Sequence, residues 1–208
     1  MQGAAELKGY PRADGRFGIR NHVLVLATVS CANGVINRVA REVPHAVCVP
    51  HAHGCGRGGA RDIEILFRVL SGMIRHPNVG AAVLVGLGCE IANTRALMPH
   101  LENPGKPLTV LNIQEEGGSL KTAEKAAAAA RAYLEDLSGA QPVPMDWKDL
   151  LVSIECGGSD AMSGVTANVV MGAAADWLAD RGASVMFGEN TEMIGTAPSH
   201  IDIGETRV

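Results

Sequence analysis

The sequence is poor in aromatic residues and lacks the patterns that mark several classes of protein. Phe, Trp and Tyr make up 3% of the 208 residues, so a core would consist mainly of aliphatic side chains. No apolar stretch reaches the ~18 residues that a transmembrane helix needs, and the N-terminal segment has no apolar core of a secretory signal. The net charge of −4 provides no basic surface for nucleic acid. We therefore expect a cytoplasmic protein with neither a membrane nor a nucleic acid as partner.

Cysteine pairs of the CxxC type are also missing, which argues against a zinc finger or zinc ribbon. The chain has five cysteines, and in a cytoplasmic protein these are expected to be thiols or metal ligands rather than disulfides. Glycine-rich nucleotide motifs are absent as well. The turn after the first predicted strand reads SCANG instead of GxGxxG, and GRGGARD lacks the Lys-Ser/Thr pair of a P-loop. A dinucleotide site and nucleotide hydrolysis are therefore poorly supported.

Apolar, β-branched runs typical of buried strands alternate with segments of helical spacing. The strand-like runs cover residues 22–30, 45–50, 81–88, 108–113, 150–155 and 183–189. Helical spacing is found at 35–43, 60–75, from Asn93 onward, 119–137 and 166–180. This alternation predicts an α/β fold with a three-layer, Rossmann-like, mainly parallel sheet. The Pro-containing segment 139–147 is predicted to link a domain of residues 1–138 to a second βαβ unit at 148–208, which we expect to be truncated.

Polar and thiol side chains gather directly after the predicted strands, where parallel α/β sheets bind their ligands. For each single cysteine the alternative is a small buried residue. Thiolate, imidazole and carboxylate together suit Fe²⁺ or Zn²⁺ better than Mg²⁺, and no ferredoxin-type run supports an iron–sulfur cluster. The residues at these positions are Cys31, His51, Cys55, Cys89, Glu90, Gln114, Glu115, Glu155, Cys156 and Glu189.

Two other segments carry groups suited to anions. Arg12, Arg16 and Arg20 surround two glycines and an aspartate, and arginine pairs bidentately with carboxylate or phosphate. The alternative is a solvated loop with one structural ion pair. Ser159 and Asp160 precede a predicted helix, whose N-terminal amides favour anions, although N-capping explains one or two of the polar side chains there.

Several motifs resemble, in the same order, the catalytic region of the altronate/galactarate dehydratase family, which also contains a sulfolactate sulfo-lyase. They are GYPRADGRFGIRNHVLVLATVSC, the HAHGCG segment, GLGCE, IQEEGG and ECGGSDAMSG followed by TAN. The resemblance runs from Gly9 to Gly195. Family members continue well beyond this length, so it implies that the chain corresponds to about the first half of the catalytic region. The chain departs from the family where Val follows Asn168, because a proline is common there.

The resemblance implies a hydro-lyase that converts a sugar acid such as altronate or galactarate into a 2-keto-3-deoxy acid with Fe²⁺ (or Mn²⁺ or Zn²⁺). Abstraction of the proton beside a carboxylate produces an enediolate that needs nearby positive charge or fixed donors. Two alternatives are a non-catalytic or incomplete domain or subunit of such an enzyme, and a sulfo-lyase that releases sulfite. We expect a homo-oligomer or association with the missing part of the catalytic region.

The resemblance marks the motif positions, and we assign roles to them by their chemistry. The predicted metal ligands are His51, Cys55, Cys89 and Cys156, and the predicted catalytic carboxylates are Glu155, Glu90 and Asp160. Arg16 and Arg20 are predicted to hold the substrate carboxylate, with Gln114 and Ser159 on its hydroxyls. His53 is expected to be an exposed loop residue.

Overall fold

A computed structural model describes residues 6–56, 59–101, 103–158 and 160–189. The chain divides into two compact units, residues 1–144 and residues 145–208. Each unit is described separately below. Throughout the described ranges, every helix is too short or too polar to cross a membrane.

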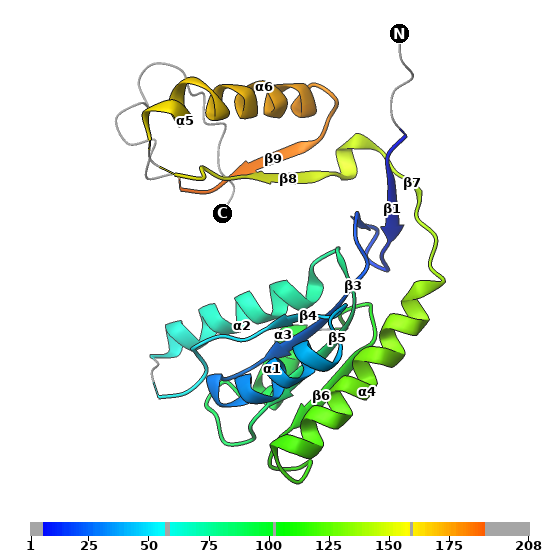
Figure 1. The fold of residues 1–208 in the computed structure, drawn as a ribbon, viewed down its shortest axis with the longest axis vertical. Helices are drawn as coiled ribbons and strands as arrows, with labels where there is room; N and C mark the ends of the chain where they lie inside the picture. Colours follow the sequence, from blue (N-terminus) through cyan, green and yellow to red (C-terminus); the bar gives the residue numbers. More distant parts are fainter. Residues whose placement is uncertain (1–5, 57–58, 102, 159, 190–208) are drawn as a thin grey trace. The chain divides into compact units, whose positions relative to one another are not determined.

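A four-stranded parallel sheet forms the centre of the first unit (Figure 1). Its strands are β3 (His22–Ala27), β4 (Val47–Val49), β5 (Val79–Gly86) and β6 (Leu108–Asn112), in the order β4-β3-β5-β6. The central strand β5 is buried along its whole length, which explains why its sequence is a continuous apolar run rather than an alternating one. The prediction of an α/β fold with a parallel sheet is confirmed.

Two pairs of helices cover the faces of this sheet. On one face, α1 (Asn33–Glu42), after the short 3₁₀ turn η1 (Ser30–Ala32), and α4 (Ser119–Ser138) pack on the valines of β3 and β5. On the other face, α2 (Ala60–Arg75) and α3 (Thr94–Leu101) pack on the leucines of the same strands. The buried stripe of α4 consists of small side chains, so this helix can lie close to the sheet without aromatic side chains between them. They are Thr122, Ala123, Ala126, Ala127 and Ala130.

A small antiparallel sheet, which the sequence analysis did not predict, precedes the parallel one. Strand β1 (Lys8–Pro11) pairs with β2 (Phe17–Gly18) through a hairpin and on its other side with β7 (Val143–Pro144). Strand β7 lies inside the segment predicted to be a linker. The hairpin leads directly into β3, so its turn lies at the end of the sheet where the parallel strands begin.

The second unit contains η2 (Trp147–Asp149), β8 (Leu151–Ile154), α5 (Ala161–Val165), α6 (Ala167–Ala179) and β9 (Ser184–Phe187). Strands β8 and β9 pair in parallel. The single predicted helix begins five residues earlier and is divided at Thr166, whose hydroxyl donates to the carbonyl oxygen of Met162 at 2.6 Å. Among the described residues of this unit only Ala183 is buried.

Candidate functional site

The loops that follow β3, β4, β5 and β6 meet at one end of the first unit's sheet, which we call the carboxyl edge. The backbone N–H of Ser30 donates to the carbonyl oxygen of His53 at 2.9 Å, and that of Ala92 donates to the oxygen of Gly54 at 3.4 Å. Gly54 has a φ of +103°, and a Cβ there would lie 2.3 Å from the oxygen of Thr28. Glycine is therefore required for this loop to approach the end of β3.

Glu90 lies in this edge as a buried carboxylate, with 2% of its surface exposed. Its Oε1 accepts hydrogen bonds from the Thr28 hydroxyl at 2.8 Å and from the Leu87 N–H at 3.2 Å. Its Oε2 accepts one from the Gly88 N–H at 2.6 Å. These hydrogen bonds join the carboxylate to the turn that carries it and to Thr28 at the end of β3. Glu90 therefore stabilises the conformation of the loop after β5.

His51 is also held by hydrogen bonds on both ring nitrogens. Nε2 lies 2.8 Å from the carbonyl oxygen of Ala27, and Nδ1 lies 3.2 Å from the backbone N–H of His53. The carbonyl must accept and the N–H must donate, so the ring carries its proton on Nε2 and is neutral. The Asn33 side chain bonds the backbone N–H and carbonyl of His51 at 3.2 and 2.9 Å. In this arrangement neither ring nitrogen has a lone pair available for a metal ion.

The thiols of the carboxyl edge are exposed at Cys31, Cys55 and Cys89. Cys55 lines a mainly apolar groove of about 460 Å³ together with His53, Asp62 and residues of α2. Gln114, on the loop after β6, lies against Gly88, where a Cβ would come within 2.7 Å of its Oε1. Within the described ranges no three His, Cys, Asp or Glu side chains lie close enough to hold a metal ion. The predicted ligands of this unit therefore do not fit a metal site by themselves.

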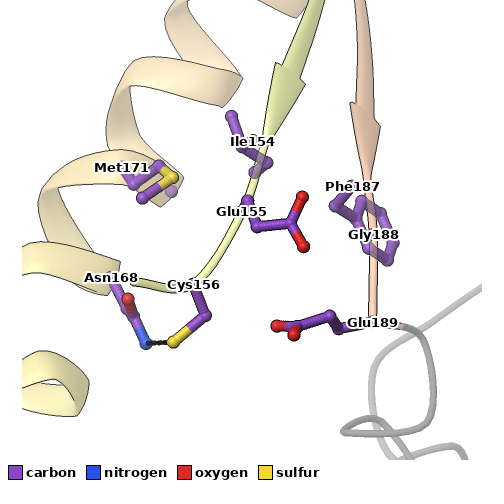
Figure 2. Close-up of a pocket in the computed structure, with 9 residues that line it drawn as sticks. Ile154, Glu155, Cys156, Asn168, Met171, Phe187, Gly188 and Glu189 are labelled. Atoms are coloured by element: carbon purple, nitrogen blue, oxygen red, sulfur yellow. Dashed lines mark hydrogen bonds between the residues drawn. The ribbon is translucent and has the colours of Figure 1, made fainter. Parts of the chain in front are cut away.

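A second site lies at the carboxyl ends of β8 and β9, in the second unit. Glu155 and Cys156 follow β8, and Gly188 and Glu189 follow β9, around a pocket of about 240 Å³ (Figure 2). Asn168 of α6 closes one side. The structure thus brings three residues that the sequence analysis placed directly after strands, Glu155, Cys156 and Glu189, into one pocket.

The side chains of this pocket differ in how firmly they are held. The Cys156 thiol donates to the oxygen of Gly158 at 3.4 Å and accepts from the Asn168 amide at 3.9 Å. The Glu155 carboxylate is exposed and has no hydrogen-bond donor among the described residues. Glu189 adopts a φ of +55°, in the left-handed region that L residues rarely enter. Glu155 is therefore a carboxylate in the pocket with free acceptor capacity.

Asp160 serves as the N-cap of α5. Its carboxylate accepts from the backbone N–H groups of Met162 and Ser163, both at 2.9 Å, and from the Ser163 hydroxyl. The hydrogen bonds from Ser163 hold the pKa of the Asp160 carboxyl below its usual value, so the group stays ionised at neutral pH. Capping accounts for all of these contacts. Ser159, predicted to bind substrate, lies outside the described residues.

Arg16 and Arg20 lie at the opposite end of the first unit's sheet, where β3, β5 and β6 begin, which we call the amino edge. Arg16 pairs with Asp14 at 2.6 Å and donates to the carbonyl oxygen of Arg75 at 2.9 Å. Arg20 donates to the oxygen of Ile19 at 2.9 Å, and its backbone N–H donates to Asn78. The structure therefore does not bring these arginines together with His51, Cys55, Cys89 or Glu90.

Three residues that organise these sites were not among the predicted ones. Thr28 donates to Glu90, Asn33 clamps the His51 backbone, and Asn168 contacts Cys156. Thr28 and Asn168 carry a readable signal, because each is a polar residue in or beside an apolar run and needs a partner once it is covered. Asn33 stands at the start of α1, where its amide would ordinarily be interpreted as a cap.

Comparison with known proteins identifies relatives along both units. Residues 9–138 match the family described as D-galactarate dehydratase/altronate hydrolase, second domain, and residues 147–202 match D-galactarate/altronate dehydratase, C-terminal.

Individual relatives cover most of this chain. The (2R)-sulfolactate sulfo-lyase subunit beta of Chromohalobacter salexigens is 36% identical over 90% of this chain and 47% of its own length. Altronate dehydratase of Bacillus subtilis is 30% identical over 90% of this chain and 39% of its own. Galactarate dehydratase (L-threo-forming) of Escherichia coli is 32% identical over 89% of this chain and 39% of its own length. The chain spans less than half the length of these relatives, and by its family matches it belongs to the D-galactarate/altronate dehydratase family.

Proposed function

We propose that the chain is part of a lyase that acts on a hydroxy acid, and that it works as an incomplete catalytic region or subunit. The reaction would remove the proton beside the carboxylate and expel a group from the adjacent carbon. The observation that carries the proposal is the pocket at the ends of β8 and β9, where Glu155, Cys156 and Glu189 surround one opening in a chain of this family.

Glu155 is the proposed base. Its carboxylate is exposed in the pocket and has no donor among the described residues, so it can accept a proton from a bound substrate. The amide of Asn168, which lines the same pocket and contacts the Cys156 sulfur, is the proposed donor for the charge that develops on the substrate carboxylate. Glu189, which follows the neighbouring strand β9, is the proposed proton donor to the leaving group.

The leaving group separates two candidate substrates. Sulfite leaves as a stable anion and needs little help from an acid, whereas hydroxide must be protonated as it departs. We favour a sulfolactate-type substrate, because identity to the sulfo-lyase subunit is 36% against 30% and 32% for the altronate and galactarate dehydratases. A dehydratase acting on altronate or galactarate is the second candidate, since those relatives match the same share of this chain.

The resemblance also implies a divalent ion, Fe²⁺ or else Mn²⁺ or Zn²⁺, which would supply a Lewis acid when bound. The described residues do not fit such an ion by themselves, because they form no three-ligand group. The proposed proton transfers are therefore assigned to Glu155 and Glu189, and no step is routed through a metal ion.

The second unit supports the proposal that a further polypeptide binds there. Val170 of α6 is 70% exposed and Leu151 of β8 is 62% exposed. A two-stranded sheet with one covering helix cannot bury such surface by itself. We propose that the equivalent of the rest of the relatives' chains, as a continuation or a separate subunit, covers these residues.

The test is a lyase assay on the chain alone and with that further polypeptide co-expressed. Sulfite release from sulfolactate and 2-keto-3-deoxy acid release from altronate and galactarate are measured side by side. We expect turnover only in the complex, loss of turnover with Glu155→Gln, and no change with Glu64→Gln, which alters an exposed carboxylate on α2. Full activity of a folded Glu155→Gln complex would contradict the assigned base.

Glu189→Gln separates the two substrates in the same assay. Dehydration is expected to lose more turnover than sulfite release, because only the hydroxide leaving group depends on the acid. Equal losses with both substrates would show that Glu189 does not protonate the leaving group.

A further inference from the structure

A group of cationic side chains gathers at the amino edge of the first unit, from segments distant in the sequence. Arg12 and Arg16 lie in the turn between β1 and β2, and Lys106 lies two residues before β6. The hairpin packs closely against the segments before β5 and β6, through Gly18 of β2 and Ala13 of the turn. A Cβ on Gly18 would lie 2.1 Å from the Pro77 oxygen, and one on Gly105 would lie 3.1 Å from the Ala13 side chain. The three cations therefore occupy fixed positions around residues 76–79.

Each of these cations is anchored by backbone carbonyls. Lys106 Nζ donates to the oxygens of His76 at 2.9 Å and Val79 at 2.7 Å. Arg12 donates through Nε to Pro77 at 2.6 Å and through Nη2 to Arg20 at 3.0 Å. These contacts hold the Lys106 and Arg12 side chains in place without neutralising their charge.

Donor capacity is left over after these contacts. The lysine ammonium has three N–H groups, and the two carbonyls take two of them. Arg16 uses Nε and Nη2 for Asp14 and the Arg75 oxygen, while no described residue accepts from its Nη1. An oxyanion could accept hydrogen bonds from Lys106 and Arg16 without displacing any contact that anchors them.

Positive charge exceeds negative charge in this group. Asp14, paired with Arg16, is the carboxylate that acts on both Arg12 and Lys106. Burial, together with the charges of Arg12 and Arg16, lowers the pKa of Lys106 to about 8. Burial followed by the charge of Lys106 likewise lowers the pKa of His76. One bound anion would relieve the repulsion among these groups.

We propose that Arg12, Arg16 and Lys106 form a binding site for a small multivalent oxyanion at the amino edge of the first unit. The ligand class is one with two or more adjacent anionic oxygens, such as phosphate or a short dicarboxylate, because the donors come from separate directions. The site is distinct from the cysteine-bearing carboxyl edge, since the eight residues of β5 separate the two edges by roughly 25 Å.

The test is calorimetric titration of the full chain with inorganic phosphate and, separately, with malonate. Lys106→Met removes one anchored cation and is expected to weaken binding about tenfold or more, because a charge-assisted hydrogen bond is lost. Lys125→Met is the matched control. It removes an exposed lysine of α4 that pairs with Glu116, and the variant should bind the anion as the wild type does. Asp14→Asn removes the competing carboxylate and should tighten binding.

A second measurement keeps the test independent of folding defects in the variants. The pKa of Lys106 is followed by NMR of its side chain in the wild-type protein, with and without the anion. The bound anion should raise this pKa from about 8 toward its usual 10.5. Phosphate binding without malonate binding would narrow the ligand to phosphates, and the reverse would narrow it to carboxylates. An unchanged Lys106 pKa with both anions, or equal binding by Lys106→Met and Lys125→Met, would overturn the proposal.

Discussion

Replacing Glu90 by Gln separates the two roles that its carboxylate can have. In the native structure the two oxygens accept from the Thr28 hydroxyl and from the backbone N–H groups of Leu87 and Gly88. Whichever way the Gln amide is oriented, its NH₂ faces one of the two backbone N–H groups, and that bond is lost. A hydrogen bond to a charged group contributes about 1.5–3 kcal/mol, and the orphaned N–H adds a desolvation cost.

The expected net loss is about 2–3 kcal/mol, because relief from burying a charge offsets part of the cost. For a chain of this size, that loss corresponds to a fall of about 5–10 °C in Tm. Calorimetry or thermal circular dichroism measures it, with Glu64→Gln as the control on the exposed side of α2. If Glu90→Gln melts like the control while the complex loses lyase activity, Glu90 is a catalytic group and the structural role assigned to it is refuted.

Three further predictions follow from the first unit. Gly86→Ala should destabilise the protein by about 1–3 kcal/mol, because the new Cβ would lie 2.6 Å from the Glu90 side chain and 2.7 Å from that of Asn112. Gly72→Ala is the control and should not destabilise it, because a Cβ there has no neighbour within 4 Å. Urea unfolding of the two variants measures the difference. The pKa of Lys106 is about 8 in the folded state and 10.5 ordinarily, so the unfolded state binds more protons between these values. The free energy of unfolding should therefore rise as the pH rises from about 8 toward 10.5. Thermal melts of Lys106→Met should lack this rise, and the same pH dependence in the variant and the wild type would contradict the prediction. Burial raises the pKa of Cys48, so iodoacetamide should alkylate it more slowly than the three exposed cysteines of the carboxyl edge, as mass spectrometry can show.

The parallel sheet was predictable because its strands are buried on both faces and therefore appear in the sequence as unbroken apolar runs. The same reasoning could not find the β1–β2–β7 sheet. Its strands have two to four residues, and their pairing joins Lys8 to Pro144 across almost the whole first unit. Short strands leave no periodicity, and their partners are set by tertiary structure.

The candidate site shows the same division between local and long-range information. Asp160 as an N-cap follows from a local pattern, an Asp three residues before a Ser at the start of a helix. The role of Glu90 depends on Thr28, 62 residues away, and that of His51 depends on the Ala27 oxygen. Position after a strand identified these residues correctly as members of an edge. The position in the sequence did not show that the polar groups of Glu90 and His51 already have hydrogen-bond partners at that edge.

The two units therefore differ in whether the polar side chains of their candidate sites already have hydrogen-bond partners. At the carboxyl edge of the first unit, Glu90 and His51 direct their acceptors and donors to neighbouring backbone, so they stabilise loops that present the exposed thiols. In the second unit, Glu155 has no donor among the described residues and faces a pocket. Apolar side chains elsewhere on α6, such as Val170, remain exposed. A carboxylate with free acceptor capacity can take a proton from a bound substrate. This difference supports Glu155, rather than Glu90, as the proposed base.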